Sequence, residues 1–461
     1  MILARYTVLR YFHYIQDIVI LAKIRRFYGL RHNLKSSIEK FEGNQLFFKV
    51  KSSSEVFEAL NQFNALADEE IFLDQAQGRV LSQNLIAPED LPGFQRSARD
   101  GYAVKAKDTF GASENMPAML EVVGEIMMGQ VPLVEVNKGQ AIKIATGGML
   151  PKGADGIVML EYAHTLDEKT IEILRTVSPQ EHVVAPGDDV RKGSRILKKG
   201  DFLRPQDLGL LAGLGFEKIR VYAKPKVAII STGDEVIPLN QQPKPGQIRD
   251  INSYALAAFC EQWGAVPLKL GLCPDSFEAL QARVAEGLAR ADTIWVSGGS
   301  SVGTRDLTLQ VMESFKEAEI LAHGIAISPG KPTIMARIGS KAVFGLPGHP
   351  VSAMVVAEVF LMPFLARLGG WADQWFHRRQ TILARLSRNV ESAGGREDYI
   401  RVKVSRQGLE WVAEPIFGKS GLITVLVEAD GLVKIDRDQE GLYQGDQVEV
   451  MLSGPWRGGN L

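Results

Sequence analysis

The chain has 461 residues, of which 45% are hydrophobic, so it can bury several cores, and about three domains of ordinary size are expected. The formal net charge is -1 with 23% charged residues, which gives no electrostatic reason to expect a nucleic acid partner. The chain has two cysteines, Cys260 and Cys273, and no repeated Cys/His spacing. This favours packing roles over redox or metal roles, and a reducing, cytoplasmic compartment.

The first part of the chain differs from the rest in charge. Residues 1–51 are rich in lysine and arginine and contain only three acidic residues, Asp17, Glu39 and Glu42. The apolar run 18–21 is far shorter than the roughly 20 residues of a membrane span, and no secretory cleavage site is evident. We therefore expect residues 1–47 to form a basic extension outside the fold, or to result from a misassigned gene start, and we expect no membrane contact.

A framework domain in two pieces is expected next, over residues 48–87 and 194–224. Val56, Leu60 and Phe63 recur every three to four residues, which predicts a helix over 54–66. Two prolines interrupt a polar run at 87–93, where the chain leaves the framework. Residues 88–193 consist of short alternating segments separated by turns, which indicate an inserted, mostly β domain. A helix that begins near Pro205 returns the chain to the framework.

Residues 225–372 alternate strands with helices. Strands are expected over 227–231, 266–270 and 293–297, and helices beginning at Asn252, at Asp275 with Glu278 in the capping-box position, and at Arg305. This order predicts a parallel sheet covered by helices on both faces. A long helix over 351–368 follows Pro350, and short alternating strands over 373–461 then predict a β-barrel or sandwich.

Three glycine-containing loops lie at strand ends of the expected parallel sheet. They span residues 229–235, 294–306 and 343–350. Glycine permits a close backbone approach, and the first turn of a helix presents free N–H groups, so such loops suit an anion. A plain turn remains an alternative for any one of them. The carboxyl ends of parallel strands meet at one sheet edge, so the three loops together indicate a binding site.

Six motifs in chain order carry a family resemblance. They occupy residues 91–104, 145–148, 231–235, 297–303, 329–332 and 345–348. The chain resembles the MoeA family of molybdopterin molybdenumtransferases, also found as the E domain of gephyrin, over about residues 48–455. The resemblance implies a multidomain α/β plus β fold, with a central doubly wound molybdopterin-binding domain, an inserted β domain, a split framework domain and a C-terminal β-barrel-like domain.

The resemblance also implies an activity. Molybdate is inserted into adenylylated molybdopterin in a Mg²⁺-dependent step that releases AMP and forms molybdenum cofactor. It further implies a homodimer, in which Asp100 and Thr146 face the α/β domain of the other subunit, and contacts with molybdopterin adenylyltransferase and molybdoenzymes. Scattered carboxylates suit Mg²⁺, which binds oxygen atoms and retains water.

Site residues follow from the same motif positions. The implied catalytic residues are Asp100, Thr146, Asp189, Glu235, Asp275 and Asp306. Four of them are the implied metal ligands: Asp100, Glu235, Asp275 and Asp306. The implied pterin-binding and oxyanion-binding residues are Thr232, Gly233, Asp234, Gly298, Gly299, Ser300, Ser301, Gly303, Ser328, Pro329, Gly330, Lys331, Pro332 and Gly348. Asp275 precedes an expected helix, so a helix cap is its alternative role.

The sequence departs from the family pattern at several positions. Ser328 and Gly324 stand where basic residues are common, Val184 stands for an arginine, and His349 for an asparagine. Lys331 remains as a cation for molybdate. The departures are compatible with a distinct subfamily, a tungstate preference or reduced activity. Two alternative functions stay open: an adenylyltransferase, which the α/β domain also resembles but which lacks the segment 100–102, and a non-catalytic cofactor carrier or scaffold.

Overall fold

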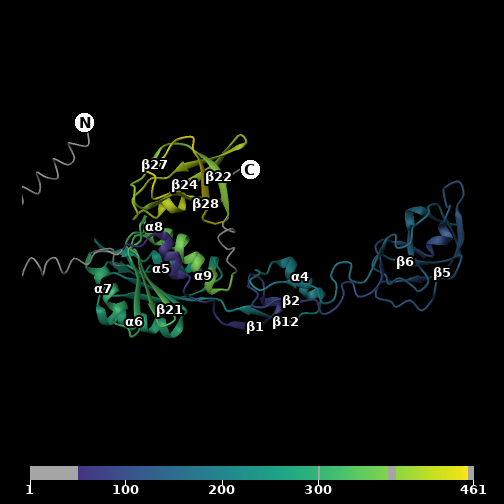
Figure 1. Cartoon of the computed structure of the whole chain (residues 1–461), viewed down its shortest axis with the longest axis horizontal. Coiled ribbons are helices and arrows are strands. Elements are labelled where there is room, and N and C mark those ends of the chain that lie inside the picture. The colour runs from purple at the N-terminus through teal and green to yellow at the C-terminus, as the bar shows by residue number, and fades with distance from the viewer. Residues whose placement is uncertain (1–49, 299–301, 372–379, 455–461) are drawn as a thin grey trace, which may run out of the picture. The chain divides into compact units, whose positions relative to one another are not determined.

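The computed structural model describes residues 50–298, 302–371 and 380–454, with the backbone alone for residues 302–306 (Figure 1). The expected basic extension at 1–47 lies outside the described residues. Three residues of the implied binding loop, Gly299, Ser300 and Ser301, lie outside them as well.

Two segments distant in sequence form one small framework. β1 (Asp68–Phe72) pairs antiparallel with β12 (Lys218–Tyr222), and β2 (Leu85–Ile86) pairs with β11 (Arg195–Leu197). Helix α4 (Pro205–Gly213) packs beside them, starting at Pro205 as expected. Their apolar side chains share one buried cluster that includes Ile71, Leu81, Leu85, Leu203, Leu211 and Val221. The chain therefore leaves this core after β2 and returns to it at β11.

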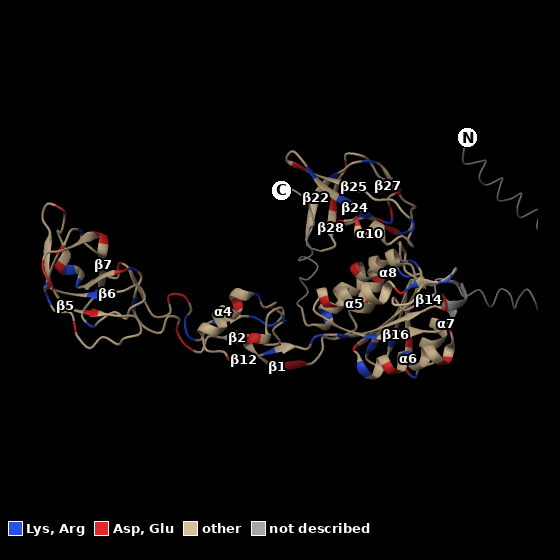
Figure 2. Cartoon of the chain, turned by 180° about the vertical axis from the view of Figure 1, so that it is seen from behind, with Lys and Arg blue, Asp and Glu red and all other residues tan. Residues whose placement is uncertain are grey.

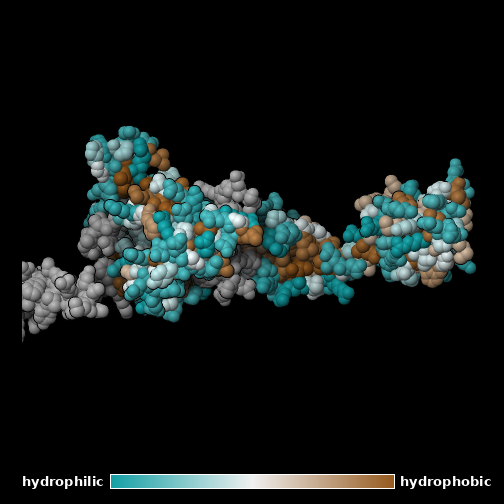
Figure 3. All heavy atoms as spheres, turned by 90° about the horizontal axis from the view of Figure 1, so that it is seen from above, coloured by the Kyte–Doolittle hydropathy of each residue, from teal (hydrophilic) through white to brown (hydrophobic). Residues whose placement is uncertain are grey.

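Between β2 and β11 the chain forms a β-rich domain. Its six-stranded sheet has the order β7-β4-β6-β5-β9-β8. The strands are β4 (Gly101–Val104), β5 (Ala118–Ile126), β6 (Gln140–Ile144), β7 (Gly156–Met159), β8 (Ala163–Thr165) and β9 (Thr170–Ile173). Figure 3 shows apolar residues exposed among polar ones on one face of this domain. Met128 and Leu133 are two of its exposed apolar residues.

The α/β domain contains the parallel sheet expected from the sequence. Its strand order is β16-β13-β17-β21-β20-β18, in which β16, β13, β17 and β21 pair in parallel, and β20 runs antiparallel to both of its neighbours, β21 and β18. The strands are β13 (Lys226–Thr232), β16 (Val266–Cys273), β17 (Thr293–Ser297), β18 (Ala318–His323), β20 (Ile334–Ile338) and β21 (Lys341–Leu346). The four parallel strands end at a common edge.

Helices cover both faces of this sheet, which confirms the doubly wound prediction. On one face α6 (Phe277–Arg290) and α7 (Val302–Glu313) pack through residues such as Leu280, Val284 and Met312. On the other face lie α5 (Asn252–Gln262), a long helix beginning at Pro350, and α3 (Ser53–Leu60). Helix α3 thus packs on the α/β sheet, although its residues belong to the segment expected in the framework.

Three helix boundaries differ from the sequence-based expectation. The helix expected from Asp275 begins at Phe277, because the Ser276 hydroxyl caps it by accepting from the Ala279 N–H at 3.4 Å. Glu278 therefore does not occupy the capping-box position. The helix expected from Arg305 begins at Val302. The helix expected over 54–66 begins with a capping box formed by Ser52 and Glu55, and it ends at Leu60.

The long helix is continuous but not uniform. It runs through α8 (Pro350–Val356), a π-helical turn η4 (Ala357–Leu361) and α9 (Met362–Leu368). Pro363 lacks an N–H for the carbonyl four residues earlier, and the wider turn lies just before it. Its length and hydropathy would suffice to cross a membrane, but 89% of the apolar stretch is buried inside the protein, as in a core helix.

The C-terminal residues form a closed β-barrel, as the family resemblance implied. β24 (Glu397–Gln407), β25 (Glu410–Pro415), β22 (Thr381–Leu386), β28 (Gln447–Leu452) and β26 (Gly431–Ile435) pair in turn, and β26 pairs back with β24. A short strand of the α/β domain, β19 (Ile327–Ser328), adds to β24 in parallel. This pairing fixes the loop after β19 against the barrel.

The distribution of charged residues and the burial of the two cysteines agree with what the composition indicated. Figure 2 shows basic and acidic residues interspersed along the ribbon of the described residues, in line with the net charge of -1. Cys260 and Cys273 are free and buried, and burial raises the pKa of both thiols. Both therefore serve as small core residues.

Candidate functional site

The carboxyl edge of the parallel sheet gathers several of the predicted residues. Thr232 ends β13, and its Oγ1 donates to Asp275 Oδ1 at 2.5 Å. The Asp275 N–H in turn donates to Asp234 Oδ1 at 3.2 Å. Asp275 therefore does not cap α6, because its carboxylate is held by the end of the neighbouring strand. The loops after β13 and β16 are joined through these bonds.

Asn252 connects three further elements at this edge. Its Nδ2 donates to Ser297 Oγ at 2.6 Å and to the Gly348 carbonyl at 2.8 Å. Asn252 is 8% exposed, and its Oδ1 has no hydrogen-bond partner among the described residues. Because the Gly348 carbonyl can only accept, it fixes which end of the amide faces it. The sequence argument did not single out Asn252, although a polar amide in the first turn of α5 was a usable signal.

A cavity of about 180 Å³, here called the sheet-edge cavity, opens among these residues. Its lining includes Thr232, Glu235, Asp250, Asn252, Ser297, Gly298, Gly348 and His349. Gly298 has φ +147°, and a Cβ there would lie 2.1 Å from the Thr232 carbonyl oxygen. Only glycine fits this position, because the end of β17 lies directly against Thr232 at the end of β13.

Asp250 supports the cavity wall. Its Oδ1 accepts from Ser231 Oγ at 3.0 Å and from the Ser253 N–H at 3.1 Å, so it caps the start of α5 and ties it to β13. The sequence argument missed this residue too. Glu235, by contrast, was predicted, and its exposed side chain folds back over Gly233.

A second cavity of about 480 Å³, here called the basic cavity, lies between the loop after β19 and the barrel. The predicted loop residues Ser328, Pro329, Gly330, Lys331 and Pro332 line it. The barrel adds three polar residues that the sequence argument missed: Arg396, Arg401 and Ser420. Two arginines of the barrel therefore face the loop that contains Ser328. Ser328 and the preceding Gly324 are the positions where the family commonly has basic residues.

Arg401 is an unusual cation because of its burial. It is 9% exposed, its Nε has no partner among the described residues, and its Nη2 makes only long bonds to the carbonyls of Ile416 and Gly418, at 3.4 and 3.3 Å. Burial lowers the pKa of its guanidinium below the ordinary value. Arg396, in contrast, pairs with Asp398 at 3.0 Å. Since a buried charge is costly without a counter-ion, the basic cavity suits an anion.

His349 borders both cavities. It precedes α8, and its Nδ1 lies 2.8 Å from Ser420 Oγ of the barrel. The Val351 N–H also donates to the Ser420 carbonyl, at 3.2 Å. The junction of the two cavities is thus built from the first turn of α8 and one barrel loop.

Asp100 and Thr146 form a separate pair on the inserted domain. The Thr146 N–H donates to Asp100 Oδ1 at 2.7 Å, and this bond, with a weaker one from the Thr146 hydroxyl, lowers the pKa of Asp100 below 3.8. Asp189 lies elsewhere, where its own N–H donates to the Leu91 carbonyl at 3.1 Å. The structure therefore brings together Asp100 and Thr146, two of the predicted catalytic residues.

The four predicted metal ligands belong to different elements of the fold. Glu235 and Asp275 lie at the sheet edge, Asp100 lies on the inserted domain, and Asp306 is a position of α7 whose side chain is not described. Gly303 is likewise described by its backbone alone. Among the described residues, no group of three or more His, Cys, Asp or Glu could hold a metal ion.

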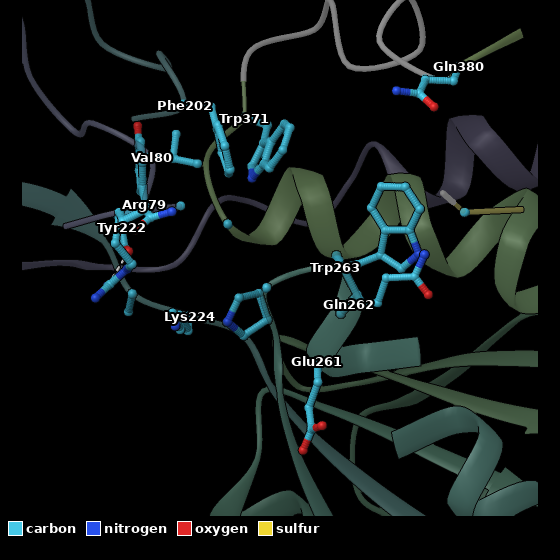
Figure 4. A pocket seen from close by; sticks show the side chains of 18 of the residues that line it. Arg79, Val80, Phe202, Tyr222, Lys224, Glu261, Gln262, Trp263, Trp371 and Gln380 are labelled. Carbon is cyan, nitrogen blue, oxygen red and sulfur yellow. Dashed lines mark hydrogen bonds between the residues drawn. The ribbon is translucent and has the colours of Figure 1, made fainter. Parts of the chain in front are cut away.

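A larger cavity, of about 630 Å³, contains none of the predicted site residues (Figure 4). The rings of Phe202 and Trp371 lie with their centroids 4.8 Å apart and their planes tilted by 42°, and Trp263 projects from the end of α5. Arg79 is already used, because it pairs with Glu69 and donates to the Tyr222 carbonyl. The aromatic lining and the satisfied arginine set this cavity apart from the sheet-edge cavity and the basic cavity.

Comparison with known proteins agrees with the geometry. Three family models match in chain order: "MoeA N-terminal region (domain I and II)" over residues 52–215, "Probable molybdopterin binding domain" over 228–367 and "MoeA C-terminal region (domain IV)" over 383–453. The molybdopterin molybdenumtransferase of Nostoc sp. is 35% identical over 349 residues, 75% of this chain and 79% of that protein.

Two further relatives cover more of the chain. The molybdopterin molybdenumtransferase of Haemophilus influenzae is 31% identical over 380 residues, 82% of this chain and 92% of that protein. The crystal structure of a molybdopterin biosynthesis MoeA protein from Pyrococcus horikosii aligns with a TM-score of 0.77 and 36% identity, over 88% of this chain and 100% of that chain.

Proposed function

Since this chain belongs to the MoeA family and acts in molybdenum cofactor biosynthesis, we propose that it is a molybdopterin molybdenumtransferase. It inserts molybdate into adenylylated molybdopterin, releases AMP and forms molybdenum cofactor. One observation carries the proposal: an anion-suited sheet edge and a basic cavity share one wall residue, His349. Such adjacency places an oxyanion beside a phosphorylated substrate.

The adenylylated pterin occupies the sheet-edge cavity. Its phosphate groups lie near Gly298 at the end of β17, and the hydroxyl of Thr232 lines the same cavity. The unpartnered Oδ1 of Asn252 is an acceptor, so it suits an N–H or O–H group of the substrate better than a phosphate oxygen.

Molybdate occupies the basic cavity. Lys331 and Arg401 compensate its charge, and Ser328 and Ser420 supply neutral hydrogen-bond donors. The described residues offer Arg401 no carboxylate, so the bound oxyanion provides the counter-ion that the buried guanidinium lacks. Arg396 and Arg401 offset the missing basic residues at Gly324 and Ser328, which supports transferase activity over a purely carrier role.

The sheet edge offers two of the carboxylates that could bind Mg²⁺, the ion that the family resemblance implies. Glu235 and Asp275 offer oxygen ligands there, and Mg²⁺ commonly uses one or two carboxylates together with substrate phosphates and water. Asp275 keeps free lone pairs after accepting from Thr232. When bound, the ion would polarise a phosphoryl oxygen, while Thr232 holds the Asp275 carboxylate in place.

The active unit is a homodimer in this proposal. Among the described residues, the hydrogen bonds and ion pairs of 94–185 extend beyond that segment only to Asp188, and none reaches the α/β domain. Asp100 and Thr146 are accordingly assigned to the site of the partner subunit. The ionised Asp100 is ready to accept a hydrogen bond from substrate or from a metal-bound water.

The proposed activity also implies a cellular location and partner enzymes. The protein acts in the cytoplasm, receives its adenylylated substrate from a molybdopterin adenylyltransferase and passes the cofactor to molybdoenzymes. Its long apolar helix is a core element of the α/β domain, which supports a location away from membranes.

One assay tests the proposed function. Purified protein is incubated with adenylylated molybdopterin, Mg²⁺ and molybdate, and both AMP and reconstituted molybdoenzyme activity are measured. Molybdate-dependent AMP release in step with cofactor formation is expected. Binding without AMP release would instead identify a carrier or scaffold, and consumption of ATP with unmodified molybdopterin would identify an adenylyltransferase.

A further inference from the structure

His349 has a position that no other described cavity residue shares. Of the residues that line the sheet-edge cavity and the basic cavity, it alone lines both. Its side chain is exposed, so a ligand in either cavity can reach it. Among the described residues, His349 is therefore the one side chain that can contact ligands in both cavities.

The barrel orients the His349 ring. Ser420 Oγ lies 2.8 Å from Nδ1, and the Ser420 carbonyl accepts from the Val351 N–H in the first turn of α8. Pro350 between them has no N–H, and its fixed φ starts the helix. The ring is thus held from both the α/β domain and the barrel.

The hydrogen bond to Ser420 also constrains the ring protons. When the Ser420 hydroxyl donates to Nδ1, the neutral ring carries its proton on Nε2; the imidazolium carries protons on both nitrogens. Nε2 has no partner among the described residues. With the Ser420 hydroxyl as donor to the neutral ring, or with the ring as imidazolium, His349 offers its Nε2–H at the junction of the two cavities.

Two anions bound side by side repel each other unless a donor or cation lies between them. Lys331 and Arg401 line the basic cavity, and Glu235, Arg249 and Asp250 line the sheet-edge cavity, but His349 borders both. We propose that His349 couples the two subsites: its Nε2–H binds an anionic oxygen at their junction, so that filling one cavity no longer weakens binding in the other. This inference rests on the proposed function.

The anionic oxygen can belong to either ligand, the phosphate or the oxyanion, and calorimetry on the full chain separates these sources. Molybdate is titrated with and without saturating AMP, and AMP with and without saturating molybdate. In the unsubstituted protein, AMP should leave molybdate affinity unchanged or raise it. In His349→Ala, AMP should weaken molybdate binding by about fivefold or more, and molybdate should weaken AMP binding by the same factor.

Three variants control for indirect effects. His349→Asn keeps a side-chain N–H donor and should restore most of the coupling. Ser420→Ala removes the group that orients the ring and should give an intermediate value. His164→Ala, at an exposed position of the inserted domain, should behave like the unsubstituted protein.

The single-ligand titrations identify which ligand supplies the oxygen that accepts the hydrogen bond from His349. A loss of molybdate affinity in His349→Ala without AMP, smaller than the loss with AMP, places the contact on the oxyanion; the corresponding loss for AMP places it on the phosphate. Equal coupling in His349→Ala and the unsubstituted protein overturns the inference while the proposed function stands. Failure of the unsubstituted protein to bind either ligand overturns both.

Discussion

The Oγ1 of Thr232 donates to the Oδ1 of Asp275 at 2.5 Å and so ties the ends of two neighbouring parallel strands, β13 and β16. The bond places a carboxylate beside the loop that the proposed function assigns to the substrate phosphates. It also explains why Asp275 is not the cap of α6, a task that Ser276 performs.

Removing this donor should lower turnover. Thr232→Val leaves the Asp275 carboxylate without its bond, and a hydrogen bond to a charged group contributes about 1.5–3 kcal/mol. We expect AMP release to slow by about tenfold to a hundredfold. Thr232→Ser keeps the hydroxyl and serves as the matched control. Equal rates for the valine and serine variants, with both proteins folded by circular dichroism, would show that the bond has no catalytic role.

The buried arginine of the basic cavity should control molybdate affinity. Arg401→Ala removes a charge-assisted contact, so the dissociation constant for molybdate should rise by about tenfold to a hundredfold. Arg406→Ala changes an exposed arginine of the same strand and is the control. If Arg401→Ala binds molybdate like the control in calorimetry, the oxyanion lies elsewhere.

Lys331 tests the loop side of the same cavity. Lys331→Ala should nearly abolish molybdate insertion, whereas Ser328→Lys should lower the required molybdate concentration by about tenfold, because it adds a cation to the cavity. The measurement is cofactor formation against molybdate concentration. Normal insertion by Lys331→Ala together with no effect of Ser328→Lys would assign this loop to the pterin alone.

The pKa of Asp100 offers a test on the inserted domain. The Thr146 backbone N–H is the main cause of its lowering, and the Thr146 hydroxyl contributes less. Thr146→Ala should therefore raise the pKa only in part, and Thr146→Pro should return it toward 3.8. Carbonyl NMR of isotope-labelled aspartate in a pH titration gives both midpoints.

The lowered pKa of Asp100 sets the direction in which the folding stability depends on pH. Because the pKa of Asp100 is lower in the folded protein, its contribution to stability is present above its ordinary pKa and is lost as the pH falls through the lowered value. The carboxylate is exposed, so the effect on unfolding should be small. An Asp100 midpoint at or above 3.8 in the unsubstituted protein would contradict the hydrogen bond.

Deletion of residues 1–47 should leave the thermal midpoint and the oligomeric state unchanged. Lys51 is already part of the fold, because its N–H donates to the Gly324 carbonyl and its carbonyl accepts from Ala326. A deletion of residues 1–52, which also removes the Ser52 cap of α3, should lower the free energy of unfolding by at least about 1 kcal/mol. A large loss of stability in the shorter deletion would show that the extension belongs to the core.

Local patterns were enough to predict the α/β domain. The strand β17 (Thr293–Ser297) and the helix start at Asn252 coincide with the sequence expectation, because a buried apolar strand and a polar-to-apolar change are local signals. The start of α6 was not predictable in the same way. Asp275 and Ser276 are both good caps, and a bond from Thr232, 43 residues earlier, determines which one is used.

The barrel half of the site could not be derived from local signals. Arg396, Arg401 and Ser420 meet the Lys331 loop only because β19 pairs with β24, and that register joins segments about 70 residues apart. Periodicity predicts that a strand exists but not which distant strand it will pair with. One clue was present: Arg401 stands in a strand whose neighbours Tyr399 and Val402 are apolar and buried.

The most direct test of the two-cavity site is a crystal structure of the protein soaked with molybdate and AMP, with anomalous scattering used to locate molybdenum. The account predicts molybdenum in the basic cavity, within hydrogen-bonding reach of Lys331 and Arg401, and AMP at the sheet edge beside Thr232 and Gly298, with His349 between them. Molybdenum bound away from Lys331 and Arg401, or AMP bound away from the ends of β13 and β17, would contradict it.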